Sequence, residues 1–191
     1  MHIGHLELII GPMFSGKTSE LISLYRKYSL SKMNPCIINY AEDTRYDTLQ
    51  LCTHDLIKIP CINSLTLGEV LTEEIISKHQ VILINEGQFF PDLYDQVRYL
   101  VDIRGKIVHV CGLDGDFHRQ KFGQILDLIS ISDKVTKHHA VCMKCENGTS
   151  GIFSHRLTSE QDVKVIGSNN YIPVCRKCYL TLNKLTNQNI N

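Results

Sequence analysis

The sequence predicts an α/β fold in which helices flank a parallel β-sheet and a small metal-bound lobe follows at the C-terminal end. Three observations predict this fold. Strand-like apolar runs alternate with helix-like segments over the first two-thirds of the chain, a glycine-rich loop follows the first run, and two Cys-x-x-Cys pairs occupy the last third. Strands that alternate with helices pair in parallel, and such sheets bind ligands at the carboxyl ends of their strands.

The predicted elements follow one another at regular spacing. Apolar runs predict strands at residues 6–10, 36–40, 81–84 and 107–111, and the last two of these strands are predicted to be buried. Helical spacing of apolar residues, with Pro91 in the first turn of the last segment, predicts helices at residues 16–32, 65–79 and 91–102. The change of composition near residue 137 predicts an α/β domain at residues 1–137, a cysteine-bearing lobe at 138–182 and a flexible tail at 183–191.

The composition is that of a globular protein without a basic excess. Hydrophobic residues make up 43% of the 191 residues, which is enough for a core that needs no disulfide framework. Lysine plus arginine equals aspartate plus glutamate, 20 against 20, whereas proteins that bind nucleic acid backbones usually carry a basic excess. No segment has the length of a membrane span, and the first ten residues lack the pattern of a signal peptide. We expect a cytoplasmic protein whose partners include neither nucleic acid nor membrane.

The glycine-rich loop carries the strongest functional signal. It matches the pattern G-x-x-x-x-G-K-[ST] with the residues Gly11-Pro12-Met13-Phe14-Ser15-Gly16-Lys17-Thr18. The glycines let backbone N–H groups point at phosphate oxygens, and the following helix adds its positive end. We expect Lys17 to contact the β- and γ-phosphates of a nucleotide and the Thr18 hydroxyl to bind Mg²⁺. A chance glycine-rich turn is the alternative, but the loop lies between a predicted strand and a predicted helix, as a phosphate-binding loop does.

A charged residue ends the third predicted strand. The apolar residues 81–84 lead directly into Asn85-Glu86-Gly87-Gln88. A carboxylate at such a place is costly unless it is paired or functional, and in P-loop enzymes this strand end supports Mg²⁺ or positions the nucleophile. Glu86 is therefore the candidate general base, and Gly87 lets the backbone turn close to a substrate. A solvated glutamate at a strand-to-loop boundary is the alternative.

Phenylalanines accompany two of the predicted strand ends. Phe89 and Phe90 follow Gln88, and Phe117 and Phe122 flank polar residues in the loop after the strand at 107–111. Core packing is the ordinary interpretation of such rings. The second loop, however, belongs to the sheet edge that carries the phosphate loop, which favours stacking of these rings on a nucleobase.

The cysteine pairs predict a structural metal site. Cys142 and Cys145 form one knuckle and Cys175 and Cys178 form the other, with residues 146–174 between them. Four thiolates complete a tetrahedral Zn²⁺ shell and leave no position for water, so we expect the metal to pin the ends of a loop or hairpin. Redox dithiols, free thiols and a nucleic-acid-binding zinc ribbon are the alternatives.

The phosphate loop, the acidic strand end and the cysteine pairs together resemble the type II thymidine kinases of animals and poxviruses. The matching segments are Gly11–Lys17, Asp43–Tyr46, Glu86–Asp92, Gly112–Gly115, Ala140–Cys145 and Val174–Tyr179. The resemblance spans nearly the whole chain. It implies a P-loop NTPase-like sheet, a zinc-bound lobe with a lasso loop, and transfer of the γ-phosphoryl group of ATP to thymidine in deoxynucleoside salvage. The short chain is closer in length to viral members than to animal ones.

The resemblance also implies roles for individual residues, with Glu86 as the catalytic base. The family's ATP and phosphate contacts match residues 11–18 together with Asp43, Thr44, Arg45, Asn85, Glu86, Gly87 and Gln88. The family's thymidine pocket and lasso match Met13, Phe89, Leu113, Phe117, Phe122, Ser154, Val163, Lys164, Val165, Ile166, Gly167 and Tyr171. Family members are often homotetramers that dTTP inhibits, which implies the same for this chain.

One residue departs from the family pattern. The family usually has Asp at the position of Asn85, where the carboxylate supports the metal, so we expect weaker support of Mg²⁺ here. Two other function classes remain open. A P-loop ATPase that drives a partner would use Glu86 to activate water, and a zinc interaction module would keep only a vestigial phosphate loop. The features that discriminate are the aromatic residues in the loop after residues 107–111 and the lasso, which an ATPase does not need.

Overall fold

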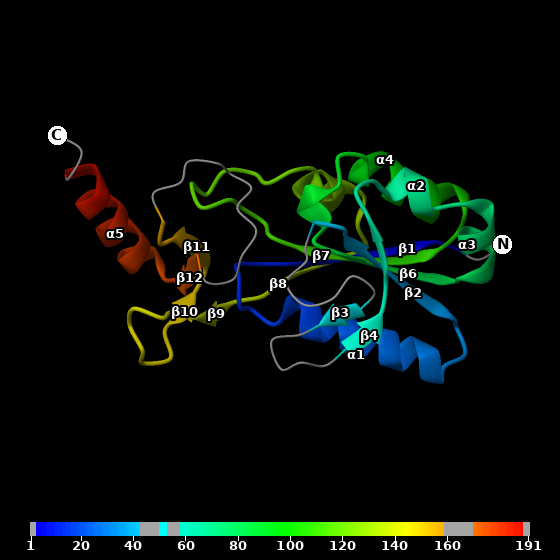
Figure 1. Ribbon diagram of the computed structural model, residues 1–191, viewed down its shortest axis with the longest axis horizontal. Helices are drawn as coiled ribbons and strands as arrows, with labels where there is room; N and C mark the ends of the chain where they lie inside the picture. The colour runs from blue at the N-terminus through cyan, green and yellow to red at the C-terminus, as the bar shows by residue number, and fades with distance from the viewer. Residues whose placement is uncertain (1–2, 43–49, 53–57, 159–169, 189–191) are drawn as a thin grey trace.

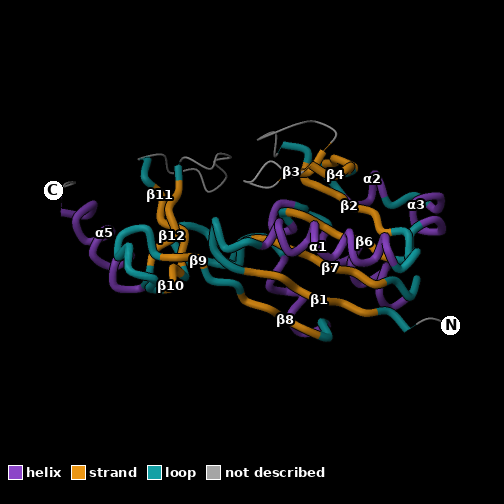
Figure 2. Tube along the Cα trace, turned by 90° about the horizontal axis from the view of Figure 1, so that it is seen from below, coloured by secondary structure: helices purple, strands orange, loops and turns teal. Residues whose placement is uncertain are grey.

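The computed structural model has an α/β part built on one sheet and a smaller C-terminal lobe at one end of it (Figure 1, Figure 2). The structure describes residues 3–42, 50–52, 58–158 and 170–188. Within these residues the main sheet has six strands in the order β5-β2-β6-β7-β1-β8, and its pairings are parallel. The strands are β1 (His5–Ile10), β2 (Pro35–Tyr40), β5 (Ile62–Ser64), β6 (Val81–Asn85), β7 (Ile107–Gly112) and β8 (Lys134–Lys137). The predicted α/β fold is confirmed.

Helices cover both faces of this sheet, which explains why its central strands are apolar along their length. The helix α1 (Lys17–Leu30) covers one face, and α2 (Leu67–Val70), α3 (Glu73–Lys78) and α4 (Leu93–Arg98) lie over the other (Figure 1). All residues of β2 and β6 are buried. Two hydrophobic cores result, one on each face, and together they hold the carboxyl ends of the strands in place.

The single helix predicted at residues 65–79 is wrong, because two short helices occupy this segment. Thr72 separates them with an extended backbone, and its hydroxyl accepts the N–H of Ile75 at 3.4 Å to cap α3. The helix predicted at residues 91–102 begins later, at Leu93, and continues as the π-helical segment η2 (Tyr99–Ile103).

Several elements were not predicted from the sequence. They are the edge strands β5 and β8, the hairpin of β3 (Gln50–Cys52) and β4 (Lys58–Pro60), and the 3-10 helices η1 (Gly87–Phe89) and η3 (Ile125–Ile131). The strand β8 has the sequence Lys-Val-Thr-Lys and is largely exposed, so it offers no apolar run. Its place in the sheet comes from pairing with β1.

The C-terminal lobe consists of short antiparallel pairs and one helix. Its elements are β9 (Ala140–Val141), β10 (Ser150–Gly151), β11 (Phe153–Arg156), β12 (Tyr171–Val174) and α5 (Arg176–Gln188). The hairpin expected between the cysteine knuckles is present as the pairing of β11 with β12. The helix α5 continues to Gln188 through a segment without glycine or proline, so residues 183–188 of the predicted tail have a helical backbone.

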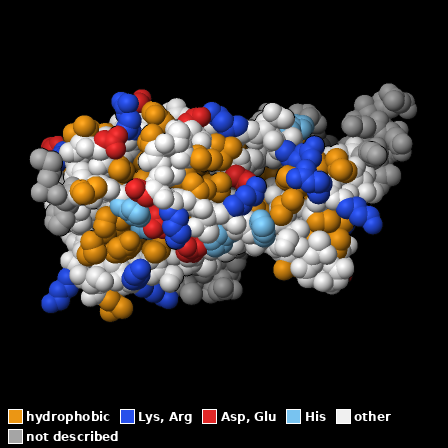
Figure 3. Space-filling model, turned by 180° about the vertical axis from the view of Figure 1, so that it is seen from behind, with side chains coloured by type: hydrophobic (Ala, Val, Ile, Leu, Met, Phe, Trp, Pro, Cys, Tyr) orange, Lys and Arg blue, Asp and Glu red, His pale blue; other side chains and the backbone are white. Residues whose placement is uncertain are grey.

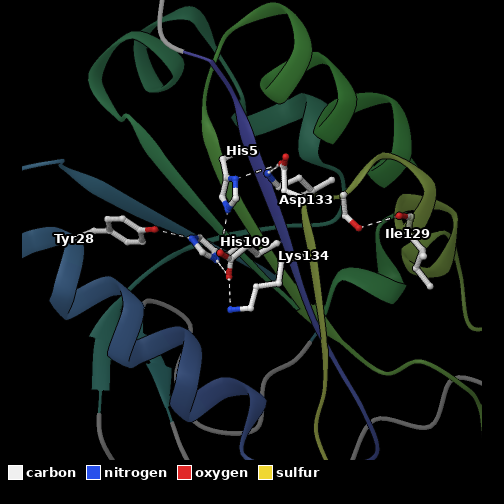
Figure 4. A network of polar contacts seen from close by, with 9 residues as sticks. His5, Tyr28, His109, Ile129, Asp133 and Lys134 are labelled. Carbon is white, nitrogen blue, oxygen red and sulfur yellow. Dashed lines mark hydrogen bonds and ion pairs between the residues drawn. The ribbon is translucent and has the colours of Figure 1, made fainter.

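A polar network crosses the α1 face of the sheet, within the first half of β1 and β7 (Figure 4). Glu7 contacts His5 at 3.0 Å and Lys134 at 3.4 Å. The Tyr28 hydroxyl on α1 lies 3.0 Å from His109 Nε2 on β7. His109 is 1% exposed, and this burial lowers its pKa to about 4. A neutral imidazole therefore joins α1 to the sheet, well before the carboxyl ends of the strands.

The surface carries charges of both signs. On the face shown in Figure 3, lysine and arginine side chains are interspersed with aspartate and glutamate over the part that contains the sheet. Among the residues described, no helix has the length and apolar character needed to cross a membrane.

Candidate active site

The phosphate loop connects β1 to α1 at the carboxyl end of the sheet. Gly11 and Gly16 have φ angles of 148° and 82°, which favour glycine. A Cβ atom on Gly11 would also lie only 2.5 Å from the carbonyl oxygen of His138. Lys17 is 9% exposed and donates to the carbonyl oxygen of Pro12 at 2.6 Å. The loop thus curls around the Lys17 ammonium, as a phosphate-binding loop requires.

Two residues from distant parts of the chain brace this loop. His138 Nδ1 lies 2.9 Å from the carbonyl oxygen of Ser15, and its Nε2 lies 2.5 Å from a carboxylate oxygen of Glu20 on α1. Met13 donates its N–H to Ser154 Oγ at 3.0 Å. His138 belongs to none of the motifs found in the sequence. No spacing pattern relates it to Ser15, because only the pairing of β8 with β1 brings them together.

Glu86 stands at the carboxyl end of β6 in a strained conformation. Its φ of 55° is left-handed, which is uncommon for a residue other than glycine and is often found at functional sites. Gln88 Nε2 donates to Glu86 Oε2 at 2.7 Å, and Gln88 Oε1 accepts the N–H of Leu113 at 2.9 Å. The carboxylate is therefore held in place from the loop that follows β7. A half-buried carboxylate fixed in this way fits a general base.

The oxygen atoms of Thr18 and Asn85 face each other between the phosphate loop and β6. Thr18 Oγ1 lies 3.5 Å from Asn85 Oδ1, and Asn85 is 1% exposed. Mg²⁺ prefers oxygen ligands and usually keeps several waters. The two side chains therefore fit a Mg²⁺ ion held directly or through water.

Aromatic rings line the loop at residues 113–123, here called the aromatic loop, and the adjacent strand end. Phe89 packs edge-to-face on Phe122 with ring centroids 5.3 Å apart. The buried Arg156 guanidinium lies 3.8 Å from the ring centroid of Phe117 and donates to the Tyr171 hydroxyl from Nε (3.1 Å) and Nη2. These contacts join the aromatic loop to the C-terminal lobe.

The predicted site residues are thus brought together in small groups. Met13 contacts Ser154, Leu113 contacts Gln88, Phe89 contacts Phe122, and Phe117 meets Tyr171 through Arg156. Eight of the predicted residues lie outside the described part of the chain: Asp43, Thr44, Arg45, Val163, Lys164, Val165, Ile166 and Gly167.

The four cysteines of the knuckles converge on one point. The Sγ atoms of Cys142, Cys145, Cys175 and Cys178 all lie within 4.8 Å of one another. Cys145 Sγ is 3.8 Å from Cys175 Sγ and 3.5 Å from Cys178 Sγ. Tetrahedral Zn²⁺ with bonds of about 2.3 Å separates its sulfur ligands by about 3.8 Å. The cluster therefore fits a tetrahedral metal ion.

The surroundings of Cys142 favour a metal-binding thiolate. Its burial raises the pKa of the thiol, but backbone N–H groups that point at the sulfur outweigh this effect and bring the pKa down to about 6. The N–H of Cys175, from the other knuckle, is one of these donors, at 3.2 Å. Thiolates are the form of cysteine that binds metals.

The parallel sheet, the phosphate loop between β1 and α1, and the polar strand end beside it define a P-loop nucleotide-binding protein. The family model described as Thymidine kinase matches residues 4–179. The thymidine kinases of Vaccinia virus (strain Western Reserve), Monkeypox virus and Variola virus are each 46% identical to this chain over 181 residues, which cover 94% of the chain and 99% of each relative. The chain belongs to the thymidine kinase family, which confirms the resemblance seen in its motifs.

Proposed function

We propose that this chain transfers the γ-phosphoryl group of ATP to the 5′-hydroxyl of thymidine, with Glu86 as the general base. The observation that carries the proposal is the carboxylate at the end of β6, tied through Gln88 to the loop after β7. In a family of phosphotransferases, a fixed carboxylate beside the phosphate loop is suited to accept the proton of an attacking hydroxyl.

The reaction forms a bond between the 5′-oxygen and the γ-phosphorus and breaks the bond between that phosphorus and ADP. Glu86 accepts the 5′-hydroxyl proton as the new bond forms. Lys17 and the backbone N–H groups of residues 11 and 13–18 bind the phosphates, and Thr18 and Asn85 would hold Mg²⁺, which offsets phosphate charge when it is bound. Catalysis is then mainly positioning and electrostatic stabilisation. Asp43, Thr44 and Arg45 complete the proposed phosphate contacts.

The thymidine pocket in this proposal lies between the phosphate loop, the aromatic loop and the C-terminal lobe. The rings of Phe89, Phe117 and Phe122 contact the base, with Met13 and Leu113 beside them. Ser154 lies near the base and supports Met13 through its hydrogen bond. Tyr171 and the lasso, residues 163–167, close over the base.

The cysteine cluster in this proposal holds a structural Zn²⁺ that fixes the two ends of the lasso-bearing hairpin. Its four ligands leave no open position, so the metal takes no part in phosphoryl transfer. We extend the proposal to an α/β domain at residues 1–137 and a zinc lobe at 138–182. It also includes a cytoplasmic homotetramer that the end product dTTP inhibits.

The proposal is tested by ADP release in the presence of ATP and Mg²⁺ with thymidine, deoxyuridine or deoxycytidine. We expect thymidine to stimulate ADP release strongly above the nucleoside-free rate. A P-loop ATPase would release ADP at the same rate with or without nucleoside. That result would contradict the proposed function.

A further inference from the structure

Three asparagine side chains form a hydrogen-bonded chain across the strands β5, β2 and β6. Asn85 Nδ2 donates to Asn39 Oδ1 at 2.8 Å, and Asn39 Nδ2 donates to Asn63 Oδ1 at 2.9 Å. The parallel register pairs Asn39 with both neighbours, so the three amides stand side by side near the carboxyl end of the sheet. We call these residues the amide chain.

The amide chain has a direction that burial enforces. Asn39 and Asn85 are 3% and 1% exposed, and a buried amide strongly favours the orientation that satisfies its donors and acceptors. Asn39 also donates to the carbonyl oxygen of Tyr40 at 3.2 Å, which fixes its nitrogen on the far side from Asn85. Asn39 therefore presents its oxygen to Asn85, and Asn85 must turn its nitrogen toward Asn39.

This orientation determines which atom Asn85 shows to the phosphate loop. Since its nitrogen is used by Asn39, its oxygen faces Thr18 Oγ1 at 3.5 Å and Cys111 Sγ at 3.0 Å. Cys111 is 1% exposed, and its thiol donates to this oxygen. A turned amide would instead present N–H groups to the thiol and to the proposed metal position.

We propose that Asn39 is a positioning residue that orients the Asn85 amide, so that an oxygen atom faces Thr18 and the Mg²⁺ position. Asn39 acts through Asn85 rather than through contact with the nucleotide. The part of this inference that concerns metal rests on the proposed function. The same inference predicts that the amide chain requires a neutral side chain at position 85, one that can donate a hydrogen bond to Asn39.

An aspartate at position 85 would conflict with the amide chain. Both of its oxygens are acceptors, and one of them would face Asn39 Oδ1 at the present 2.8 Å separation. Asn39 would have to turn, which would bring its oxygen against Asn63 Oδ1 and the carbonyl oxygen of Tyr40. The usual family residue is therefore disfavoured here unless Asn39 also changes.

The test is a double-mutant cycle with Asn39→Leu and Asn85→Asp, read out as Mn²⁺ affinity of the ADP complex by electron paramagnetic resonance. In the native background, Asn39→Leu frees the Asn85 amide to turn. We expect Mn²⁺ affinity to fall roughly five-fold, the factor that one neutral hydrogen bond supplies, with metal-free ADP affinity unchanged. In the Asn85→Asp background, the same substitution removes an opposing oxygen, so we expect Mn²⁺ affinity to rise or stay constant.

Two further variants keep the test decisive. Gln80→Met removes a hydrogen bond to the carbonyl oxygen of Gly105 at the opposite end of β6, so it should lower the melting temperature without changing Mn²⁺ affinity. If Asn39→Leu does not fold, Asn63→Ala removes the acceptor that helps to orient Asn39, and we expect a smaller fall in Mn²⁺ affinity in the native background only.

Equal Mn²⁺ losses in both backgrounds, or no loss in either, would overturn the role of Asn39. Because the measurement needs no turnover, its outcome is separate from that of the proposed function. A protein that fails to phosphorylate thymidine, but loses Mn²⁺ affinity on Asn39→Leu in the native background only, would contradict the kinase reaction alone.

Discussion

The phosphate loop and the C-terminal lobe are held together by different means. The loop is fixed by a buried parallel sheet, two glycines with positive φ and side chains that brace its backbone. The lobe has a small core of its own, and its two knuckles converge on a cluster of four sulfur atoms. We therefore expect the proposed phosphate site to depend on the fold as a whole, and the proposed thymidine pocket to depend on the four-cysteine cluster and on a few contacts between the two parts.

Those contacts are specific enough to be tested singly. Ser154 accepts the N–H of Met13, and the Tyr179 hydroxyl donates to the carbonyl oxygen of Phe117 at 2.7 Å. Each joins the lobe to an element of the proposed thymidine pocket. Substitutions in the lobe should therefore weaken thymidine binding more than ATP binding. Substitutions at the end of β6 should leave both affinities unchanged and lower the rate of phosphoryl transfer.

The largest expected effect is that of Glu86→Gln. The substitution keeps the hydrogen bond to Gln88 possible but removes the proton acceptor, so kcat should fall on the order of a hundredfold or more. ATP and thymidine affinities, measured by calorimetry, should change little. Near-native turnover would show that Glu86 is not the base.

The substitution Cys175→Ser should separate the two regions. Metal analysis should find one Zn²⁺ per native chain and a reduced content in the variant. Loss of the metal loosens both ends of the hairpin, so the KM for thymidine should rise about tenfold, in line with loss of a metal-dependent positioning element, while the KM for ATP changes less than twofold. A metal-free protein with native thymidine affinity would refute the role of the lobe.

A smaller effect is expected for Ser154→Ala. It removes the hydroxyl that accepts the backbone N–H of Met13. Because the loss of one hydrogen bond corresponds to a factor of about five, the KM for thymidine should rise roughly fivefold. Ser154→Thr retains the acceptor and serves as the matched control. Equal effects of both substitutions would show that the volume of the side chain matters rather than its hydroxyl.

The polar network at His109 should affect stability without affecting either binding region. The folded protein holds the pKa of His109 at about 4, below its ordinary value of 6.5, so the unfolded chain binds more protons between these values. The free energy of unfolding therefore has its full value, as far as His109 is concerned, above pH 6.5. It falls by up to about 3 kcal/mol as the pH drops to 4. Urea denaturation at pH 7 and pH 4.5 should show a smaller decrease for His109→Gln than for the native chain.

The sequence predicted the elements whose signals are local. A few consecutive residues suffice to recognise the apolar runs of β6 and β7, the glycines of the phosphate loop and each cysteine pair. The break at Thr72 was missed because a helical apolar pattern continues across it, and only the cap shows the interruption. The strand β8 was missed because an exposed edge strand needs no apolar face.

The site was predicted less completely than the fold, for a related reason. Sequence motifs indicate candidate ligand-binding residues, but they do not indicate the residues that position those side chains and loops. His138 and Asn39 reach Ser15 and Asn85 only through strand pairing, so no spacing in the chain reveals them. Glu86 was identified from its place after an apolar strand, whereas its bond to Gln88 and its left-handed backbone are visible only in the structure.

The proposed reaction passes the phosphoryl group to a nucleoside and not to water. It is tested most directly by incubating the protein with ATP labelled in its γ-phosphate, thymidine and Mg²⁺, and separating the products. We expect the label to appear in thymidine 5′-phosphate, and we expect Glu86→Gln to abolish most of this transfer. Label found in inorganic phosphate, at a rate independent of thymidine, would contradict it.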